Sequence, residues 1–116
     1  MSVTIYGIKN CDTMKKARAW LEKHGVQYAF HNYKTQGIER AKLEGWAKKL
    51  GWEALLNKSG MTFRKLPEKE KAVSDAKQAI ALMLAQPSVI RRPVLELGGG
   101  KILAGFKPEI YKAALK

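Results

Sequence analysis

The sequence predicts an α/β protein in which a helical insertion separates the two halves of a mixed β-sheet. Two patterns lead to this prediction. Residues 3–31 read as strand, helix and strand, the length of a βαβ unit, whose right-handed crossover makes its two strands parallel. Residues 93–115 read as two strands and a helix, and the stretch between the two patterns is helical. The expected order is therefore βαβ, several helices and ββα, with four strands in one sheet.

The first strand and the first helix meet at the only cysteine of the chain. Residues 3–8 are mostly apolar and favour a strand. Apolar residues then recur at the spacings of three and four that are typical of one helix face: Met14, Ala17, Trp20 and Leu21. We expect this helix to run from about Cys11 to His24, with Gly25 directly after its end. Residues 26–31 alternate well enough for the second strand.

The middle of the chain has helical periodicity. One predicted helix closes at Gly51. Its apolar face consists of Leu43, Trp46, Ala47 and Leu50. Residues 52–58 read as a short helix or turn, and residues 57–62 read as a loop. Ser74 is the expected N-cap of a further helix that Pro87 ends. The apolar side of that helix consists of Ala76, Ala79, Ile80, Met83 and Leu84.

The end of the chain returns to strands. Residues 93–97 predict a strand, the three glycines 98–100 a turn, and residues 101–104 the returning strand of a β-hairpin. Pro108 opens the last helix, because proline is tolerated in the first turn. We expect this helix to end at Leu115.

Size and charge narrow the class of protein. The 116 residues, of which 46% are hydrophobic, suffice for one domain with a single core. We expect residues 1–35 and 87–116 to form the sheet-bearing core and residues 36–86 the helical insertion. The chain has 22 Lys and Arg against 10 Asp and Glu, a net charge of +12, which favours anionic partners. Nucleic acid, acidic lipid or a small carboxylate or phosphate compound fits this charge, and a basic surface without such a partner is the alternative.

The sequence also indicates a compartment. No secretory pattern opens the chain, and its longest run without a polar residue, 79–85, is too short to span a bilayer. One cysteine cannot form an intramolecular disulfide. We therefore expect a cytoplasmic protein without a membrane partner, and we expect it to be a monomer.

Cys11 is the candidate reactive residue. A thiol at a strand-to-helix switch lies near the free N–H groups and the positive end of the helix dipole, which favour the thiolate. Lys9, Lys15 and Lys16 add positive charge nearby. The position favours a redox or nucleophilic cysteine over the alternative, an inert buried side chain.

Two further segments bear on the chemistry. Arg92 precedes Pro93 at the start of a predicted strand, and the X-Pro bond is cis beside the site or trans, as is common at a strand start. Arg92 offers a planar charged fork to a carboxylate or oxyanion, or it is a solvated surface residue. Arg64 lies beside a polar loop, where anion binding competes with simple exposure. His24 and His31 lack partners at zinc spacing, so we expect no metal site.

Together these features resemble the arsenate reductase (ArsC) and Spx family, and the likeness covers nearly the whole chain. It is carried by residues 6–13, 31–35, 55–60, 63–66 and 90–94. Residues 11–18 are most similar to the YffB branch, whose members are proposed to be glutathione-dependent thiol reductases. The resemblance implies a thioredoxin-like fold of the glutaredoxin type with a helical insertion. It also implies that Cys11 is the reactive thiol and that Arg92-Pro93 carries the cis-proline of that fold.

The sequence departs from the family pattern at three positions. Arsenate reductases of this type use three arginines for the oxyanion; Arg92 matches the second, while Asn57 and Gly105 stand where the first and third are expected. This argues against arsenate reduction. Met14 replaces the second cysteine of the Cys-X-X-Cys motif that is common in Spx regulators, which removes a disulfide switch. The segment 104–106 is similar to the Gly-aromatic end seen in Spx.

Three functional hypotheses follow. The first is a thiol-disulfide reductase in which Cys11 forms a mixed disulfide that external glutathione resolves. We expect the binding residues for glutathione, a co-substrate, to be Lys9, Asn10, Thr13, Arg64, Arg92 and Pro93. The second is an Spx-like module that binds RNA polymerase independently of Cys11. The third is a nucleic-acid binder driven by the net charge, which would show a steep salt dependence.

Overall fold

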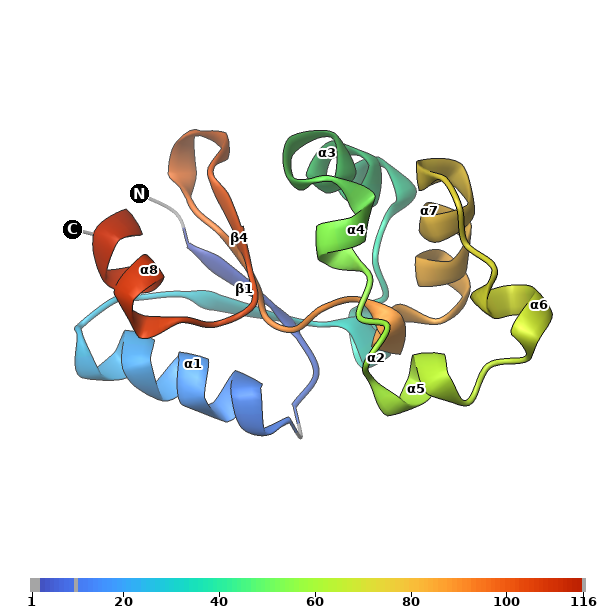
Figure 1. Cartoon of the computed structure of the whole chain (residues 1–116). Helices are drawn as coiled ribbons and strands as arrows, with labels where there is room; N and C mark the ends of the chain where they lie inside the picture. The colour runs from blue at the N-terminus through green and yellow to red at the C-terminus, as the bar shows by residue number, and fades with distance from the viewer. Residues whose placement is uncertain (1–2, 10, 116) are drawn as a thin grey trace. The chain divides into compact units, whose positions relative to one another are not determined.

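The contacts of the chain divide it into two compact units (Figure 1). The computed structural model describes residues 3–9 and 11–115. The first unit comprises the described residues of Met1–Asn32 and Arg92–Lys116, and it carries the β-sheet. The second unit, Tyr33–Arg91, is built from short helices.

The sheet of the first unit has four strands in the order β2-β1-β3-β4. The strand β1 (Thr4–Gly7) runs parallel to β2 (Ala29–Asn32) and antiparallel to β3 (Val94–Glu96). The last strand, β4 (Ile102–Ala104), pairs antiparallel with β3, and the short 3₁₀ helix η2 (Gly98–Gly100) lies in the turn between them. This arrangement confirms the predicted mixed sheet, its parallel βαβ pair and its terminal hairpin.

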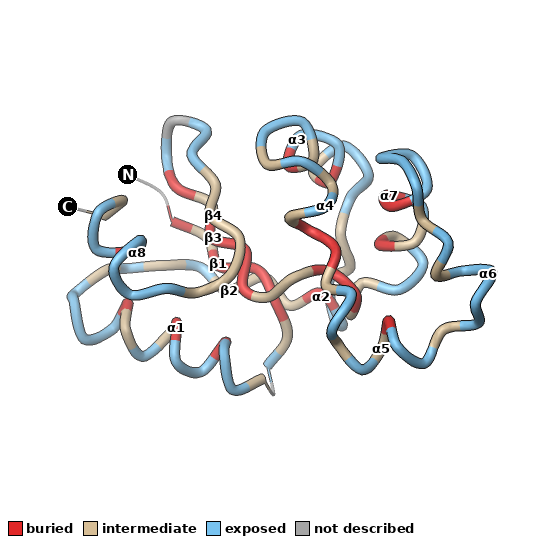
Figure 2. Tube along the Cα trace, in the orientation of Figure 1, coloured by how far each residue is buried: buried red, intermediate tan, exposed pale blue. Residues whose placement is uncertain are grey.

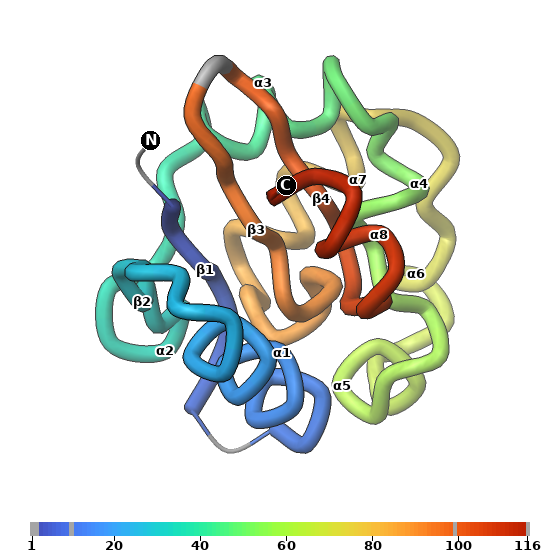
Figure 3. Tube along the Cα trace, turned by 90° about the vertical axis from the view of Figure 1, so that its left-hand side faces the viewer, coloured from blue at the N-terminus to red at the C-terminus, as the bar shows by residue number. Residues whose placement is uncertain are grey.

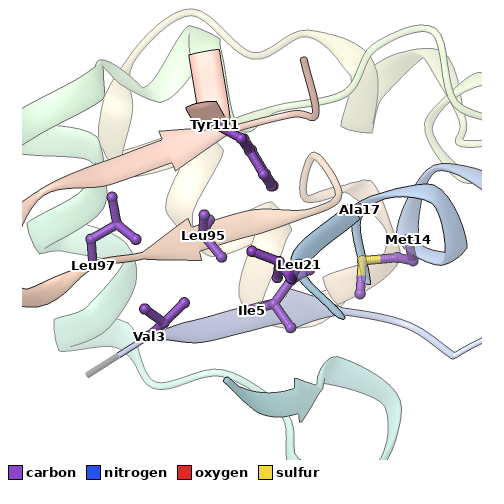
Figure 4. Packing of buried hydrophobic residues seen from close by; sticks show 8 residues of the cluster. All are labelled: Val3, Ile5, Met14, Ala17, Leu21, Leu95, Leu97 and Tyr111. Carbon is purple, nitrogen blue, oxygen red and sulfur yellow. The ribbon is translucent and has the colours of Figure 1, made fainter. Parts of the chain in front are cut away.

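Two helices cover one face of this sheet. These are α1 (Asp12–Lys23) and α8 (Pro108–Ala114), which lie in front of the strands in Figure 3. Side chains from both helices and from the strands form one buried cluster (Figure 4): Val3, Ile5, Met14, Ala17, Leu21, Leu95, Leu97 and Tyr111. Figure 2 shows the buried residues of α1 as separate red positions that recur along an otherwise exposed or half-buried helix. The three-and-four spacing read from the sequence therefore marks the face of α1 that packs on the sheet.

The opposite face of the sheet carries apolar side chains such as the buried Val94 together with a polar pair. The hydroxyl of Tyr6 donates a hydrogen bond of 3.0 Å to Oε1 of Glu96. The ring of Tyr6 lies 4.8 Å from that of His31 on the neighbouring strand. Successive strand residues point to opposite faces, so Ile5 enters the core while Tyr6 faces away from it.

The second unit consists of short helices: α2 (Tyr33–Gln36), α3 (Arg40–Leu50), α4 (Trp52–Leu55), α5 (Met61–Arg64), α6 (Glu68–Lys71), α7 (Ala76–Ala85) and the 3₁₀ helix η1 (Pro87–Val89). Helices α3, α4 and α7 pack against one another. Trp46 of α3 and Met83 of α7 are almost fully buried. An isolated antiparallel bridge between Leu56 and Ile90 ties the segment after α4 to the segment after η1.

The strand predicted at residues 26–31 begins later, at Ala29. The N–H of Val26 donates to the carbonyl of Leu21 and the N–H of Gly25 donates to that of Glu22, with Gly25 at a φ of 69°. These two bonds are the Schellman motif that closes a helix. Val26 is thus engaged in ending α1, and this is why it does not begin β2.

Two predictions in the second unit were wrong in detail. The loop predicted at residues 57–62 gives way to α5, which begins at Met61. The N-cap of α7 is Asp75 instead of Ser74, since Oδ1 of Asp75 accepts a 2.8 Å hydrogen bond from the N–H of Gln78. A carboxylate interacts more favourably with the helix dipole than a hydroxyl does. Ser74 instead donates from its N–H and hydroxyl to Oε1 of Gln78.

Within residues 3–9 and 11–115, none of the helices combines the length and the apolar character that crossing a membrane requires.

Candidate active site

Cys11 occupies the N-cap of α1, where the chain leaves β1. Its backbone is extended, with φ −142° and ψ 127°, and its carbonyl accepts the first helical hydrogen bond, 2.9 Å from the N–H of Lys15. The side chain is partly buried and the thiol is free. Cys11 therefore lies between β1 and α1, as the sequence predicted.

The surroundings of Cys11 favour the thiolate. Burial raises the pKa of the thiol. The N–H of Met14, the guanidinium of Arg92 and the N–H of Thr13 lower this pKa, and their combined effect is larger than that of burial. The net pKa lies below the ordinary value of 9.0. The neutral thiol makes no regular capping hydrogen bond with these N–H groups, because sulfur is only a weak acceptor.

Arg92 reaches Cys11 because of the register of the sheet. Tyr6 of β1 pairs with Val94 of the antiparallel β3, so the segment entering β3 lies beside the segment leaving β1. The Arg92–Pro93 peptide bond is cis, as the family resemblance implies. The buried Pro93 begins the sheet segment, and its carbonyl accepts a 2.8 Å hydrogen bond from the N–H of Gly105.

The other predicted binding residues lie in different places. Lys9 and Thr13 have exposed side chains next to Cys11 in the chain. Arg64 is exposed at the end of α5 and belongs to the second unit, so its part in binding stays a prediction. Asn10 lies outside the described residues. The lowered pKa of Cys11 traces to Arg92 and to backbone N–H groups, and the lysines are not among its causes.

The two positions that lack the family's arginines have local roles of their own. Oδ1 of Asn57 accepts a 2.9 Å hydrogen bond from the hydroxyl of Ser59. Gly105 has a φ of 83°, in the left-handed region that a side chain disfavours, and its carbonyl accepts from the hydroxyl of Tyr111 at 3.5 Å. An arginine at position 105 would therefore be strained.

Sequence reasoning missed the part played by Met14. It treated this residue only as a replacement for a second cysteine and as a member of the helix face, whereas its N–H is among the groups that stabilise the thiolate. The N-cap position of Cys11 was the available signal, because the N–H groups two and three residues after an N-cap point back toward it.

Among residues 3–9 and 11–115, no group of three or more His, Cys, Asp or Glu side chains is placed to hold a metal ion. The groups that the fold does bring together at this site are the Cys11 thiol, the Arg92 guanidinium and the N–H donors of the first turn of α1.

A mixed sheet with Cys11 at the start of a helix and a cis-proline segment at the start of β3 is the arrangement of a thioredoxin-like fold. Comparison with known proteins narrows this class. The model of the ArsC family matches residues 6–114. The chain belongs to the ArsC family.

Individual relatives place the chain within that family. A solved structure called YFFB protein is 58% identical, with a TM-score of 0.95, and the match covers 99% of this chain and 100% of the other. An arsenate reductase (ArsC) related protein from Brucella melitensis is 59% identical, with a TM-score of 0.77, over 100% and 96% of the two chains. An uncharacterized protein of Haemophilus influenzae is 39% identical over 97% of each chain. The YffB-like branch proposed from residues 11–18 is thereby confirmed.

The comparison also extends to regulators. The global transcriptional regulator Spx of Streptococcus pneumoniae is 27% identical over 97% of this chain and 85% of its own. Arsenate reductase-like proteins and Spx are therefore both relatives of this chain.

Proposed function

We propose that this protein is a glutathione-dependent thiol-disulfide reductase in which Cys11 is the only redox-active residue. The observation that carries the proposal is the pairing of the Cys11 thiol with the Arg92 guanidinium at the start of α1. This pairing favours the thiolate, which is the form of cysteine that attacks disulfides.

The reaction has two balanced steps. The Cys11 thiolate attacks one sulfur of a disulfide or of a glutathionylated protein; a Cys11–S bond forms, the substrate S–S bond breaks, and the substrate leaves as a thiolate. When the retained group is glutathione, the thiolate of a second glutathione attacks the mixed disulfide. Oxidised glutathione leaves and the Cys11 thiolate returns, so one free glutathione thiol is oxidised for each glutathionylated substrate reduced.

The chain supports an external resolving thiol. It has a single cysteine, so no internal thiol can release the mixed disulfide. Glutathione carries two carboxylates, and we assign Lys9 and Arg92 of the first unit to bind them. The carbonyl of Pro93 already accepts from Gly105, so we assign pairing with the peptide of glutathione to the backbone of Arg92. Such a cycle runs in a reducing compartment, which is the cytoplasmic location expected from the sequence.

The test is adduct formation on the intact protein. Mixing with oxidised glutathione should add one glutathione to Cys11, and excess reduced glutathione should remove it. Intact-mass spectrometry over time follows both steps. Arg92→Ala should slow adduct formation by about tenfold or more, since it removes a donor to the thiolate and a ligand for a carboxylate.

Two variants control this experiment. Lys48→Ala removes a positive charge from an exposed position on α3, and it should react like the parent. Arg92→Lys keeps the charge but not the planar fork, and it should fall between the parent and Arg92→Ala. A parent protein that forms no adduct would end the glutathione proposal, as would equal rates for Arg92→Ala and Lys48→Ala.

Arsenate reduction is not part of the proposal. The first and third family arginines are replaced by Asn57 and Gly105. We expect little or no arsenate turnover when glutathione and glutaredoxin are supplied, because one arginine is a weak clamp for an oxyanion. Reduction of arsenate at a rate comparable with that of disulfide substrates would contradict this expectation.

Binding to RNA polymerase is the second candidate function, and the match to Spx over nearly the whole chain favours it. If the protein acts in this way, Cys11→Ser should bind purified RNA polymerase as well as the parent does. Co-migration of both proteins with the polymerase in gel filtration would support this function.

A further inference from the structure

The strand β1 and the helix α1 approach each other closely at Gly7. A Cβ atom built on Gly7 would overlap Sδ of Met14 and would lie 2.8 Å from its Cε and 3.2 Å from its Cγ. No real side chain at position 7 fits this space unless Met14 moves. A glycine inside a strand commonly marks such a close approach of another element.

Met14 is enclosed by the core of the first unit. Its side chain is fully buried, and it belongs to the same cluster as Ile5, Ala17 and Leu21 (Figure 4). Methionine is flexible, but protein interiors are packed as tightly as crystals. A methyl group at position 7 is therefore expected to displace the backbone of the first turn of α1 along with the Met14 side chain.

The first turn of α1 is also the part of the helix that serves the thiol. Met14 lies three residues after Cys11, and its N–H is one of the donors near the sulfur. We propose that Gly7 is a positioning residue for Cys11. Because Gly7 has no side chain, the Met14 side chain can pack directly against β1, and this packing keeps the N–H groups of the first turn of α1 at the sulfur. Gly7 touches no reacting atom and acts only through Met14.

This inference rests on the proposed function only in taking Cys11 as the reacting group. Its test needs no glutathione, so the two can fail separately. The rate of Cys11 alkylation by iodoacetamide is measured against pH for the parent, Gly7→Ala, Met14→Ala and the double variant Gly7→Ala/Met14→Ala. Gly45→Ala is the matched control, since a Cβ at Gly45 meets nothing within 4 Å.

Gly7→Ala should shift the midpoint of the pH profile upward and slow alkylation at pH 7 by about two- to tenfold, because the rate follows the thiolate fraction. Gly45→Ala should keep the parental midpoint. In the Met14→Ala background the added methyl at position 7 should leave the midpoint unchanged, since the side chain it would displace is gone.

Three results would overturn the proposal. A folded Gly7→Ala with the parental midpoint would show that Met14 adjusts by side-chain rotation alone. An equal upward shift in the Met14→Ala background would show that Gly7 does not act through Met14. If Gly7→Ala alone does not fold, circular dichroism should show that the double variant folds better than Gly7→Ala, and its alkylation midpoint should equal that of Met14→Ala. A double variant that folds no better than Gly7→Ala contradicts the proposal.

Discussion

The two units of the chain position their residues by different means. In the first unit, a hydrogen-bonded sheet sets the register of distant segments, so that Arg92 meets Cys11 although about 80 residues of sequence separate them. In the second unit, short helices pack against one another with buried side chains such as Trp46, and an isolated bridge joins Leu56 and Ile90. The comparison teaches that the candidate site lies in the unit where the backbone hydrogen bonds of a sheet fix the geometry.

The largest expected effects come from emptying the core of each unit. Leu95→Ala in β3 should cost about 2–5 kcal/mol and Trp46→Ala in α3 about 3–5 kcal/mol, because both side chains are almost fully buried. Urea unfolding followed by tryptophan fluorescence and by labelling of Cys11 measures both. Since the sequence predicts a single domain, the two probes should report one transition.

Ile110→Ala is the control for these substitutions. Its side chain is 44% exposed, so truncation should change the free energy of unfolding by less than about 0.5 kcal/mol. Trp20 lies in the first unit, and Trp46 and Trp52 lie in the second, so the fluorescence reports on both units. Separate transitions, in which Leu95→Ala shifts the thiol signal but leaves a second fluorescence transition unmoved, would show two independently folding units and would contradict the single-domain prediction.

A smaller effect tests which residue caps the N-terminus of α7 in the second unit. Asp75→Ala should cost about 0.5–2 kcal/mol, because it removes the acceptor for the N–H of Gln78 at the start of α7. Ser74→Ala should cost less, since it removes only the hydroxyl donor to Gln78 and keeps the N–H donor. Thermal unfolding of both variants compares the two losses of stability. A greater loss of stability in Ser74→Ala than in Asp75→Ala would show that Ser74 is the N-cap, as predicted from the sequence.

The smallest effect is the pH dependence that Cys11 gives to the first unit. The folded protein holds the pKa of this thiol below 9.0, so the thiolate stabilises the folded state. That contribution is complete above 9.0 and is lost as the pH falls through the lowered value. Cys11→Ser should therefore flatten the rise of the unfolding free energy with pH in this window, and Arg92→Ala should reduce it. Urea titrations at a series of pH values measure the slope, and an unchanged slope in Cys11→Ser would contradict the assignment.

The sequence by itself determined the class of fold and the first half of the site. Local signals were sufficient there: apolar spacing marked the buried face of α1, Gly25 its end, Pro108 the start of α8 and the three glycines the turn of the hairpin. The single cysteine between strand and helix needed no long-range information, because an N-cap and its free N–H groups are features of neighbouring residues. The family was readable for the same reason, since its motifs are contiguous segments.

Local competition was harder to predict. Val26 could begin a strand or close a helix, and Ser74 and Asp75 are both good caps. In each case two nearly equal local structures compete, and hydrogen bonds formed in the folded chain select one of them. The short helix that begins at Met61 falls in the same group, because a single turn has little periodicity to detect.

Only the tertiary structure decided which charge lies at the thiol. The sequence placed lysines near Cys11, yet the charge that lowers its pKa belongs to Arg92, which the antiparallel pairing of β1 and β3 brings to the sulfur. The cis state of the Arg92–Pro93 bond and the contact between Gly7 and Met14 are likewise invisible in any single segment. The physical reason is that register and close packing are properties of pairs of segments. They are set when the buried face of α1 and the strands of the sheet close into one core.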